Sequence, residues 1–135
     1  MEILASCKDY VIYDDFAHHP TEIFKTLSSL REKIGNDQII ALIEPRSRTM
    51  QSGLHDKEMA KALSPADSVI WYEGQDVKRS MSAELKKAKA EVYFAANISE
   101  IIQITRQIKT TKSNIVIMSN GDFSGLRELI KKELD

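Results

Sequence analysis

The chain has 135 residues, which is the size of one ordinary domain and long enough to bury a real core. Its 19 basic and 20 acidic residues give a formal net charge of −1, which predicts no broad attraction to nucleic acid or to an anionic membrane. The single cysteine, Cys7, excludes an intrachain disulfide and is typical of a reducing compartment. No apolar run approaches the ~20 residues of a membrane span, and no signal peptide is recognisable, so we expect a cytoplasmic protein.

The first third of the chain predicts two strands and a helix. Glu2–Ser6 is a candidate strand, and residues 10–13 (Y-V-I-Y) predict a second, because β-branched and aromatic residues fill a segment too short for a helix. Pro20 suits the first position of a helix that Gly35 would end. Between them, apolar residues recur with helical spacing at Ile23, Phe24, Leu27, Leu30 and Ile34.

The remaining residues continue the alternation of strands and helices. Four further strands are predicted at Gln38–Ile43, Ser68–Tyr72, 91–94 and 114–118. Helices are predicted around residues 57–63 and after Asn97, which stands at capping-box spacing from Glu100. Met81, Leu85 and Ala88 could line a short helix, and a last helix would turn Leu126, Leu129 and Ile130 inward.

Continuous apolar strands separated by helices are typical of a parallel sheet that is covered on both faces. We therefore predict one Rossmann-like, three-layer α/β domain over residues 1–135, with a mostly parallel sheet of about six strands. Glu2–Ser6 is the candidate antiparallel edge strand. Ligands bind such sheets in the crevice beyond the carboxyl ends of the strands.

Three loops expected at that edge are rich in functional groups. They are residues 14–20 (D-D-F-A-H-H-P), residues 44–50 (E-P-R-S-R-T-M) and residues 119–125 (S-N-G-D-F-S-G). The convergence of three such loops is a stronger indication of a binding site than any one of them.

In the first loop, a carboxylate of Asp14 or Asp15 could accept ribose hydroxyls, while His18 and His19 could donate to phosphate or carboxylate oxygens. Simple capping of the next helix by Asp14 or His19 is one alternative. A metal site is another, but zinc takes three or four ligands and the chain has only three histidines and a distant cysteine, so we predict no metal site.

The other two loops carry weaker signals. The guanidinium groups of Arg46 and Arg48 suit carboxylates, although an arbitrary arginine pair is more often a solvated surface feature. Ser119 and Asn120 supply polar atoms, but a plain strand-to-helix turn would have the same composition. The chain also lacks a G-x-x-x-x-G-K-[ST] phosphate loop, a G-x-G-x-x-G fingerprint and a G-x-S-x-G elbow, so it has the features of half an active site.

The loop motifs, read with their flanking residues, resemble the C-terminal domain of the Mur ligase family in order and spacing. These motifs are V-I-Y-D-D-F-A-H-H-P-T-E-I, E-P-R-S-R-T-M and M-S-N-G-D-F-S-G. Members that add L-alanine typically have Tyr-Gly in place of Phe16-Ala17 and a Q-P-H-R loop in place of residues 44–47, so the resemblance is to members that add a murein tripeptide. Asp122 and Ser124 replace two glycines of the family's S-N-G-G-F-G-G loop.

The resemblance implies an ATP-dependent ligase of peptidoglycan recycling. Such an enzyme joins L-Ala-γ-D-Glu-meso-diaminopimelate to UDP-N-acetylmuramate through an acyl phosphate. The N-terminal UDP-sugar domain and the central ATPase domain would precede this one and hold most of the ATP and Mg²⁺, so the isolated domain should be inactive. The alternatives are the same domain of an L-alanine-adding ligase, or a stand-alone α/β binding module.

The resemblance also implies roles for individual residues. Asp15 would approach the ATP ribose, with Asp14 as the second candidate. His18 and His19 would face the junction of nucleotide and acceptor near the reaction centre, with His18 on the ATP side and His19 on the substrate side. Substrate contacts beyond His19 would come from Arg46, Arg48, Ser119 and Asn120.

Overall fold

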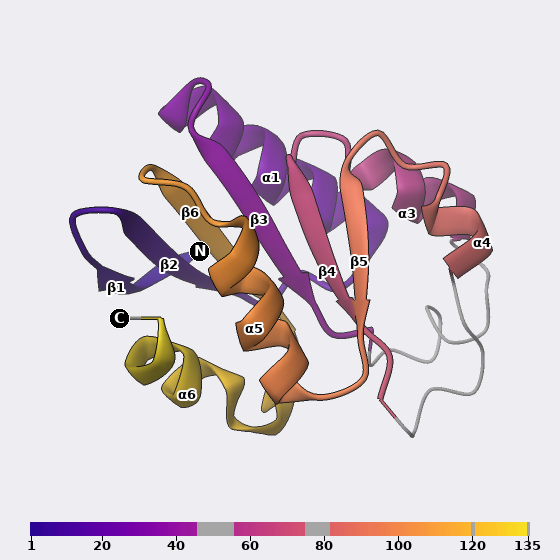
Figure 1. The fold of residues 1–135 in the computed structure, drawn as a ribbon. Coiled ribbons are helices and arrows are strands. Elements are labelled where there is room, and N and C mark those ends of the chain that lie inside the picture. The colour runs from indigo at the N-terminus through magenta and orange to yellow at the C-terminus, as the bar shows by residue number, and fades with distance from the viewer. Residues whose placement is uncertain (46–55, 75–81, 120, 135) are drawn as a thin grey trace.

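The computed structural model describes residues 1–45, 56–74, 82–119 and 121–134. The described part is a six-stranded sheet between two layers of helices (Figure 1). Its strands are β1 (Glu2–Ser6), β2 (Tyr10–Asp15), β3 (Gln38–Ile43), β4 (Ser68–Tyr72), β5 (Glu91–Ala95) and β6 (Ser113–Met118). The spatial order is β1-β2-β6-β3-β4-β5. The predicted three-layer α/β architecture is therefore confirmed.

Strand direction also follows the prediction. β1 pairs with β2 in antiparallel fashion, which confirms Glu2–Ser6 as the edge strand, and every other pair in the sheet is parallel. β2 is two residues longer than predicted, because its backbone stays in register with β6 until Asp15 lies opposite Met118. Asp14 and Asp15 are thus the last residues of a strand, and the loop begins at Phe16.

The helices divide between the two faces of the sheet (Figure 1). One face carries α1 (Pro20–Ile34), α3 (Asp56–Ala62) and α4 (Ser82–Leu85), and the other carries α5 (Ile98–Ile108) and α6 (Leu126–Glu133), the last preceded by the short 3₁₀ helix η1 (Phe123–Gly125). The central position of β3 in the sheet explains why its sequence has no polar residue after Gln38. Ile39, Ala41 and Ile43 face the first layer while Ile40 and Leu42 face the second, so both sides of the strand are buried.

Local signals set the helix ends as expected. The side chain of Asn97 accepts a 2.9 Å bond from the backbone N–H of Glu100, and the Glu100 carboxylate in turn accepts from the N–H of Ala96. Gly35 ends α1 at φ 69°, with its N–H donating to the carbonyl of Arg31 at 3.0 Å. Within the described ranges, no helix is both long and apolar enough to cross a membrane.

Two apolar side chains that helical spacing singles out, Leu129 and Phe24, lie outside the core. Leu129 is 42% exposed, so the expectation that it turns inward is wrong. α6 packs through Leu126 and Ile130, which stand four residues apart on one narrow stripe, and Leu129 is turned away from that stripe by the helical rotation of about 100° per residue. Phe24 is 48% exposed for the same reason, since it follows the buried Ile23 directly.

Tyr13 on β2 lies just before the two aspartates and joins the sheet through its hydroxyl. Its O–H donates to the Asn114 Oδ1 on β6 at 3.3 Å. Burial raises the pKa of the Tyr13 phenol above its ordinary value, since the charged phenolate would be poorly solvated there. The side chain is therefore a neutral donor that ties β2 to β6.

Candidate functional site

The carboxyl ends of β2, β6 and β3 lie side by side, because β6 inserts between the two strands that precede it in the chain. The backbone N–H of Ser119 donates to the carbonyl of Asp15 at 3.1 Å, and the N–H of Glu44 donates to the carbonyl of Met118 at 3.1 Å. The first residues of the three polar loops therefore lie next to one another at the strand ends.

The chain leaves these strand ends in opposite directions. β2 is followed by α1 on one face of the sheet, whereas β6 is followed by α6 on the other. A crevice opens in such sheets where successive connections diverge, and it is the usual place for a ligand. The polar loops thus lie at the point where the topology favours binding.

Asp15 lies at the carboxyl end of β2, on the α1 side of the sheet. Its Oδ1 accepts a 2.8 Å bond from the N–H of Ala17, and its Oδ2 accepts a 3.3 Å bond from the Thr26 hydroxyl. The carboxylate lines a cavity of about 520 Å³. The other lining residues are Met1, Phe16, Ala17, Glu22, Lys25, Thr26 and Ser29. The bonds hold the carboxylate in a fixed direction beside open space.

Phe16 is the aromatic side chain of this cavity, and it was not singled out from the sequence. It is 74% exposed, in a loop whose neighbours are tied down by hydrogen bonds. A solvent-exposed aromatic ring beside a cavity offers a flat apolar face on which a ligand can pack. The signal that could have found it is a lone aromatic residue inside an otherwise polar loop.

Asp14 points to the opposite side and is paired with Arg127, in the first turn of α6. The Arg127 Nε donates to the Asp14 Oδ1 at 2.7 Å, and the two side chains are only 19% and 18% exposed. The same guanidinium donates to the carbonyl of Gly121 at 2.8 Å and to that of Ser119 at 3.4 Å. Arg127 therefore joins the end of β2 to the third loop.

Ser119 and Glu44 form a second link between loops. The Ser119 hydroxyl donates to the Glu44 Oε1 and accepts from the N–H of Gly121 at 3.0 Å. Ser119 is completely buried and Glu44 is 6% exposed. A carboxylate buried this deeply needs such a donor, so the pair connects the ends of β6 and β3 from within. The acceptor contact expected of Ser119 remains a prediction.

The two histidines lie together at the start of α1. Their rings are 4.7 Å apart between centroids, and the His18 Nδ1 lies 3.0 Å from the carbonyl oxygen of Phe16. His19 is the N-cap residue by its backbone, but its side chain makes no capping bond, and Asp14 is bonded to Arg127 instead. The alternative that either side chain merely caps the helix is wrong. Both imidazoles are half-buried.

Three predicted site residues, Arg46, Arg48 and Asn120, lie outside the described residues. Across the parts of the chain that the structure does describe, no group of three or more His, Cys, Asp or Glu side chains is placed to hold a metal ion.

The backbone of the third loop is strained at Ser124, where the family motif has a glycine. Phe123, Ser124 and Gly125 all have positive φ, at 52°, 51° and 77°. A side chain at such angles costs roughly 1 kcal/mol, whereas glycine adopts them freely. Asp122, the other residue that replaces a family glycine, has an ordinary helical conformation at φ −74°. Only one of the two replacements is therefore strained.

Replacing Ser124 with glycine should stabilise the chain by up to about 1 kcal/mol, because the strain is removed at the cost of a more flexible unfolded chain. Asp122→Gly is the matched control. It should destabilise the folded chain by about 0.5–1 kcal/mol, because the glycine relieves no strain and only increases the entropy of the unfolded chain. Urea unfolding of both variants measures the difference. Equal changes in the same direction would contradict the assignment of strain to Ser124.

Together, the fold and the sequence define a class of protein: a mostly parallel α/β domain with polar loops at the carboxyl ends of its strands and no phosphate loop in its sequence. The sequence model of the "Mur ligase, glutamate ligase domain" matches residues 1–121. The chain belongs to the Mur ligase family and corresponds to its C-terminal domain. Members of this family are ATP-dependent ligases of peptidoglycan synthesis.

Individual relatives agree with this placement. The chain is 33% identical to the UDP-N-acetylmuramate–L-alanyl-γ-D-glutamyl-meso-2,6-diaminoheptandioate ligase of Haemophilus influenzae over 135 residues, covering 99% of this chain and 30% of that protein. It is 52% identical to the UDP-N-acetylmuramate–L-alanine ligase of Streptococcus agalactiae over 119 residues, covering 85% of this chain and 26% of that one. The chain thus spans less than a third of the length of these relatives.

A solved structure extends the similarity to three dimensions. It is a crystallised domain from Haemophilus ducreyi attributed to a UDP-N-acetylmuramate:L-alanyl-γ-D-glutamyl-meso-diaminopimelate ligase. It superposes with a TM-score of 0.83 at 33% identity, covering 99% of this chain and 98% of that one. A chain of nearly the same extent has therefore been crystallised without further domains.

Proposed function

We propose that this chain is the acceptor-binding domain of an ATP-dependent ligase that joins L-Ala-γ-D-Glu-meso-diaminopimelate to UDP-N-acetylmuramate in peptidoglycan recycling. The observation that carries the proposal is that three polar loops start from the adjacent ends of β2, β6 and β3, in a chain of the Mur ligase family. The name of the Haemophilus influenzae relative, which matches almost the whole chain, supports this choice of acceptor. The reaction would take place in the cytoplasm.

The nucleotide would approach from the Asp15 side. Two bonds already orient the Asp15 carboxylate, and its remaining lone pairs could accept ribose hydroxyls at the edge of the 520 Å³ cavity. The exposed ring of Phe16 would offer a stacking face beside it. Asp14 is the weaker candidate, because Arg127 occupies one of its oxygens. Domains upstream of this chain would supply the phosphate loop and hold most of the ATP and Mg²⁺.

The acceptor would approach the other two loops. Arg46 and Arg48 follow the buried end of β3, and their guanidinium groups suit the several carboxylates of the tripeptide. His18 and His19 would lie between nucleotide and acceptor. Asn120 would contact the backbone of the peptide, and Ser119 is the weaker candidate because its buried hydroxyl is bonded to Glu44. The hydrogen bonds of Arg127 and Glu44 would keep these loops in one arrangement.

The Arg46 assignment has a direct test. In the full-length enzyme, Arg46→Ala should raise the KM for the tripeptide by about 10- to 150-fold, since a charge-assisted hydrogen bond contributes ~1.5–3 kcal/mol. The KM for ATP should change little, and Arg106→Ala on the exposed side of α5 is the control. An equal rise in both KM values would refute the assignment.

A second candidate acceptor, L-alanine, has a specific observation in its favour. The chain is 52% identical to the L-alanine ligase of Streptococcus agalactiae over 119 residues. Against it stand Phe16-Ala17 and the Glu44-Pro45-Arg46-Ser47 loop, which depart from the motifs typical of L-alanine-adding members. A third candidate is a stand-alone binding module, for which the gene would encode no phosphate loop upstream.

The chain by itself should fold but not turn over ATP, because the phosphate loop is missing from its sequence. Circular dichroism would establish folding, and a coupled ADP-release assay would measure turnover. ATP hydrolysis by the pure 135-residue chain, abolished by Asp15→Ala, would contradict the proposal.

A further inference from the structure

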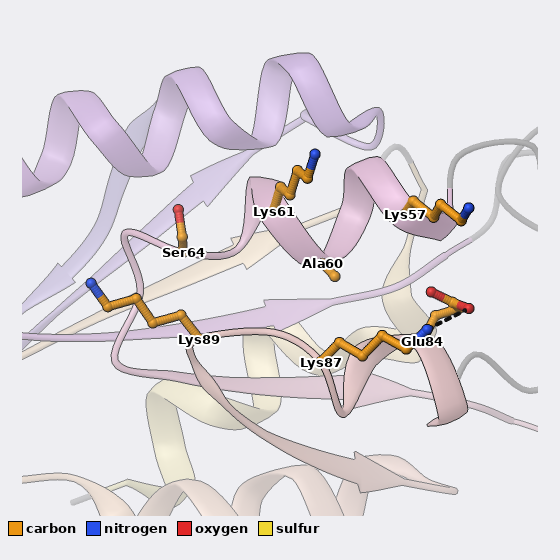
Figure 2. Close-up of a pocket in the computed structure, with 7 residues that line it drawn as sticks. All are labelled: Lys57, Ala60, Lys61, Ser64, Glu84, Lys87 and Lys89. Carbon is orange, nitrogen blue, oxygen red and sulfur yellow. Dashed lines mark hydrogen bonds and ion pairs between the residues drawn. The ribbon is translucent and has the colours of Figure 1, made fainter.

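A basic cavity lies between α3 and the segment that leads from α4 to β5 (Figure 2). Its volume is about 450 Å³, within the range of small-molecule sites. It is lined by Lys57, Ala60, Lys61, Ser64, Glu84, Lys87 and Lys89. None of these residues belongs to the three loops of the candidate site, and the proposed ligase chemistry uses none of them.

The charge of this cavity is strongly unbalanced. Of the described side chains that line it, four carry ammonium groups and one carries a carboxylate, that of Glu84, which pairs with the Lys87 Nζ at 3.3 Å. In the part of the chain that the structure describes, the other three lysines form no ion pair. The cavity thus holds a local excess of positive charge in a chain whose net charge is −1. Such a concentration attracts and concentrates anions.

The lysines are spread along the cavity and do not gather at one point (Figure 2). Figure 2 shows Lys57 and Lys87 toward the end where Glu84 lies, and Lys89 with the Ser64 hydroxyl toward the other end. Lys61 lies between them on α3, and the buried methyl group of Ala60 lies on the inner side of the same helix. An anion with two charged groups could contact ammonium groups at both ends.

The chemistry of the lining favours phosphate. Among the described residues that line the cavity there is no arginine fork of the kind that binds carboxylates in bidentate fashion. There are instead four point charges and a hydroxyl donor, which suit phosphoryl oxygens. None of these described lining residues is aromatic, so none offers a ring on which a nucleic-acid base could stack. We propose that this cavity binds a compact diphosphate group, either as inorganic diphosphate or as part of a nucleoside diphosphate.

The test titrates the 135-residue chain with inorganic diphosphate at low ionic strength, by calorimetry and by amide chemical shifts. We expect binding whose shifts fall on residues 57–64 and 84–89, and which weakens as salt rises toward about 300 mM, since exposed charges are screened. The double variant Lys61→Gln/Lys89→Gln should bind about ten-fold more weakly, because each exposed pair contributes up to ~1 kcal/mol. Separate titrations with UDP and ADP distinguish the free from the nucleotide-borne diphosphate.

The matched control is Lys8→Gln/Lys132→Gln, which removes two exposed lysines from other surfaces and should leave the affinity within two-fold. Thermal unfolding checks that both double variants fold as the native chain does. The proposal is overturned if diphosphate does not bind at millimolar concentration, or if the control variant loses as much affinity as the cavity variant. Equal binding of citrate would overturn the choice of phosphate chemistry.

Discussion

Arg127→Gln should destabilise the chain by about 2 kcal/mol. The change leaves the Asp14 carboxylate without its 2.7 Å partner and the Gly121 carbonyl without its 2.8 Å donor. Loss of one member of a fully buried pair costs roughly 3–5 kcal/mol, and the smaller figure here allows for the partial exposure of both side chains. Urea unfolding measures the effect. Arg127→Lys keeps the positive charge but not the forked guanidinium, so its stability should lie between those of the native chain and Arg127→Gln.

Arg106 provides the matched control for Arg127. Its guanidinium also joins two helices, through Glu133 on α6, but both side chains are about half exposed. Arg106→Gln should therefore cost less than about 1 kcal/mol. A double-mutant cycle between Asp14→Asn and Arg127→Gln should give a coupling energy of about 1 kcal/mol or more. If the two arginine variants are equally stable, Arg127 does not hold the loops together.

Ser119→Ala should cost about 2 kcal/mol, for a different reason. It removes the hydroxyl that donates to the carboxylate of Glu44, and an ionised group left buried without its donor is costly to desolvate. In a Glu44→Gln background the same substitution should cost only about 1 kcal/mol, because a neutral amide loses less when its partner is removed. Unfolding of the single and double variants supplies the cycle.

One outcome of this double-mutant cycle would contradict the role of the Glu44 carboxylate. If Ser119→Ala costs the same with glutamate and with glutamine at position 44, then the charge of Glu44 does not matter to the link between β6 and β3. Glu44→Gln alone should be tolerated within about 1 kcal/mol, since the amide oxygen can still accept from the Ser119 hydroxyl. A much larger loss would mean that the carboxylate has a further partner in the folded chain.

The fold could be predicted because its strands are short runs of β-branched and aliphatic residues with no polar alternation, as in β3. Proline and glycine at the ends of α1 marked that helix. The strand ends could be predicted less well. Asp14 and Asp15 belong to β2 only because β6 pairs alongside them, and a pairing between residues about a hundred positions apart leaves no local signal.

The candidate site could be located but not assembled from the sequence. The three polar loops were recognised, yet Arg127 and Glu44 were not given roles. In the sequence, Arg127 is one of many charged residues in the predicted C-terminal helix. Its partner Asp14 is 113 positions away, so no local pattern indicates the contact. That contact exists because β6 lies beside β2 and sends α6 to the opposite face from α1. The order of strands in space, which the sequence pattern leaves open, decides which polar groups meet.

We propose that this domain presents a peptide acceptor to a nucleotide held by domains upstream. The most direct test is ADP release by the full-length protein given ATP, Mg²⁺ and UDP-N-acetylmuramate, with either the murein tripeptide or L-alanine as acceptor. We predict release that depends on the tripeptide, is lost with Asp15→Ala, and does not occur with L-alanine. Release with L-alanine alone would contradict the proposed acceptor, and no release with either would contradict the assignment as a peptide ligase.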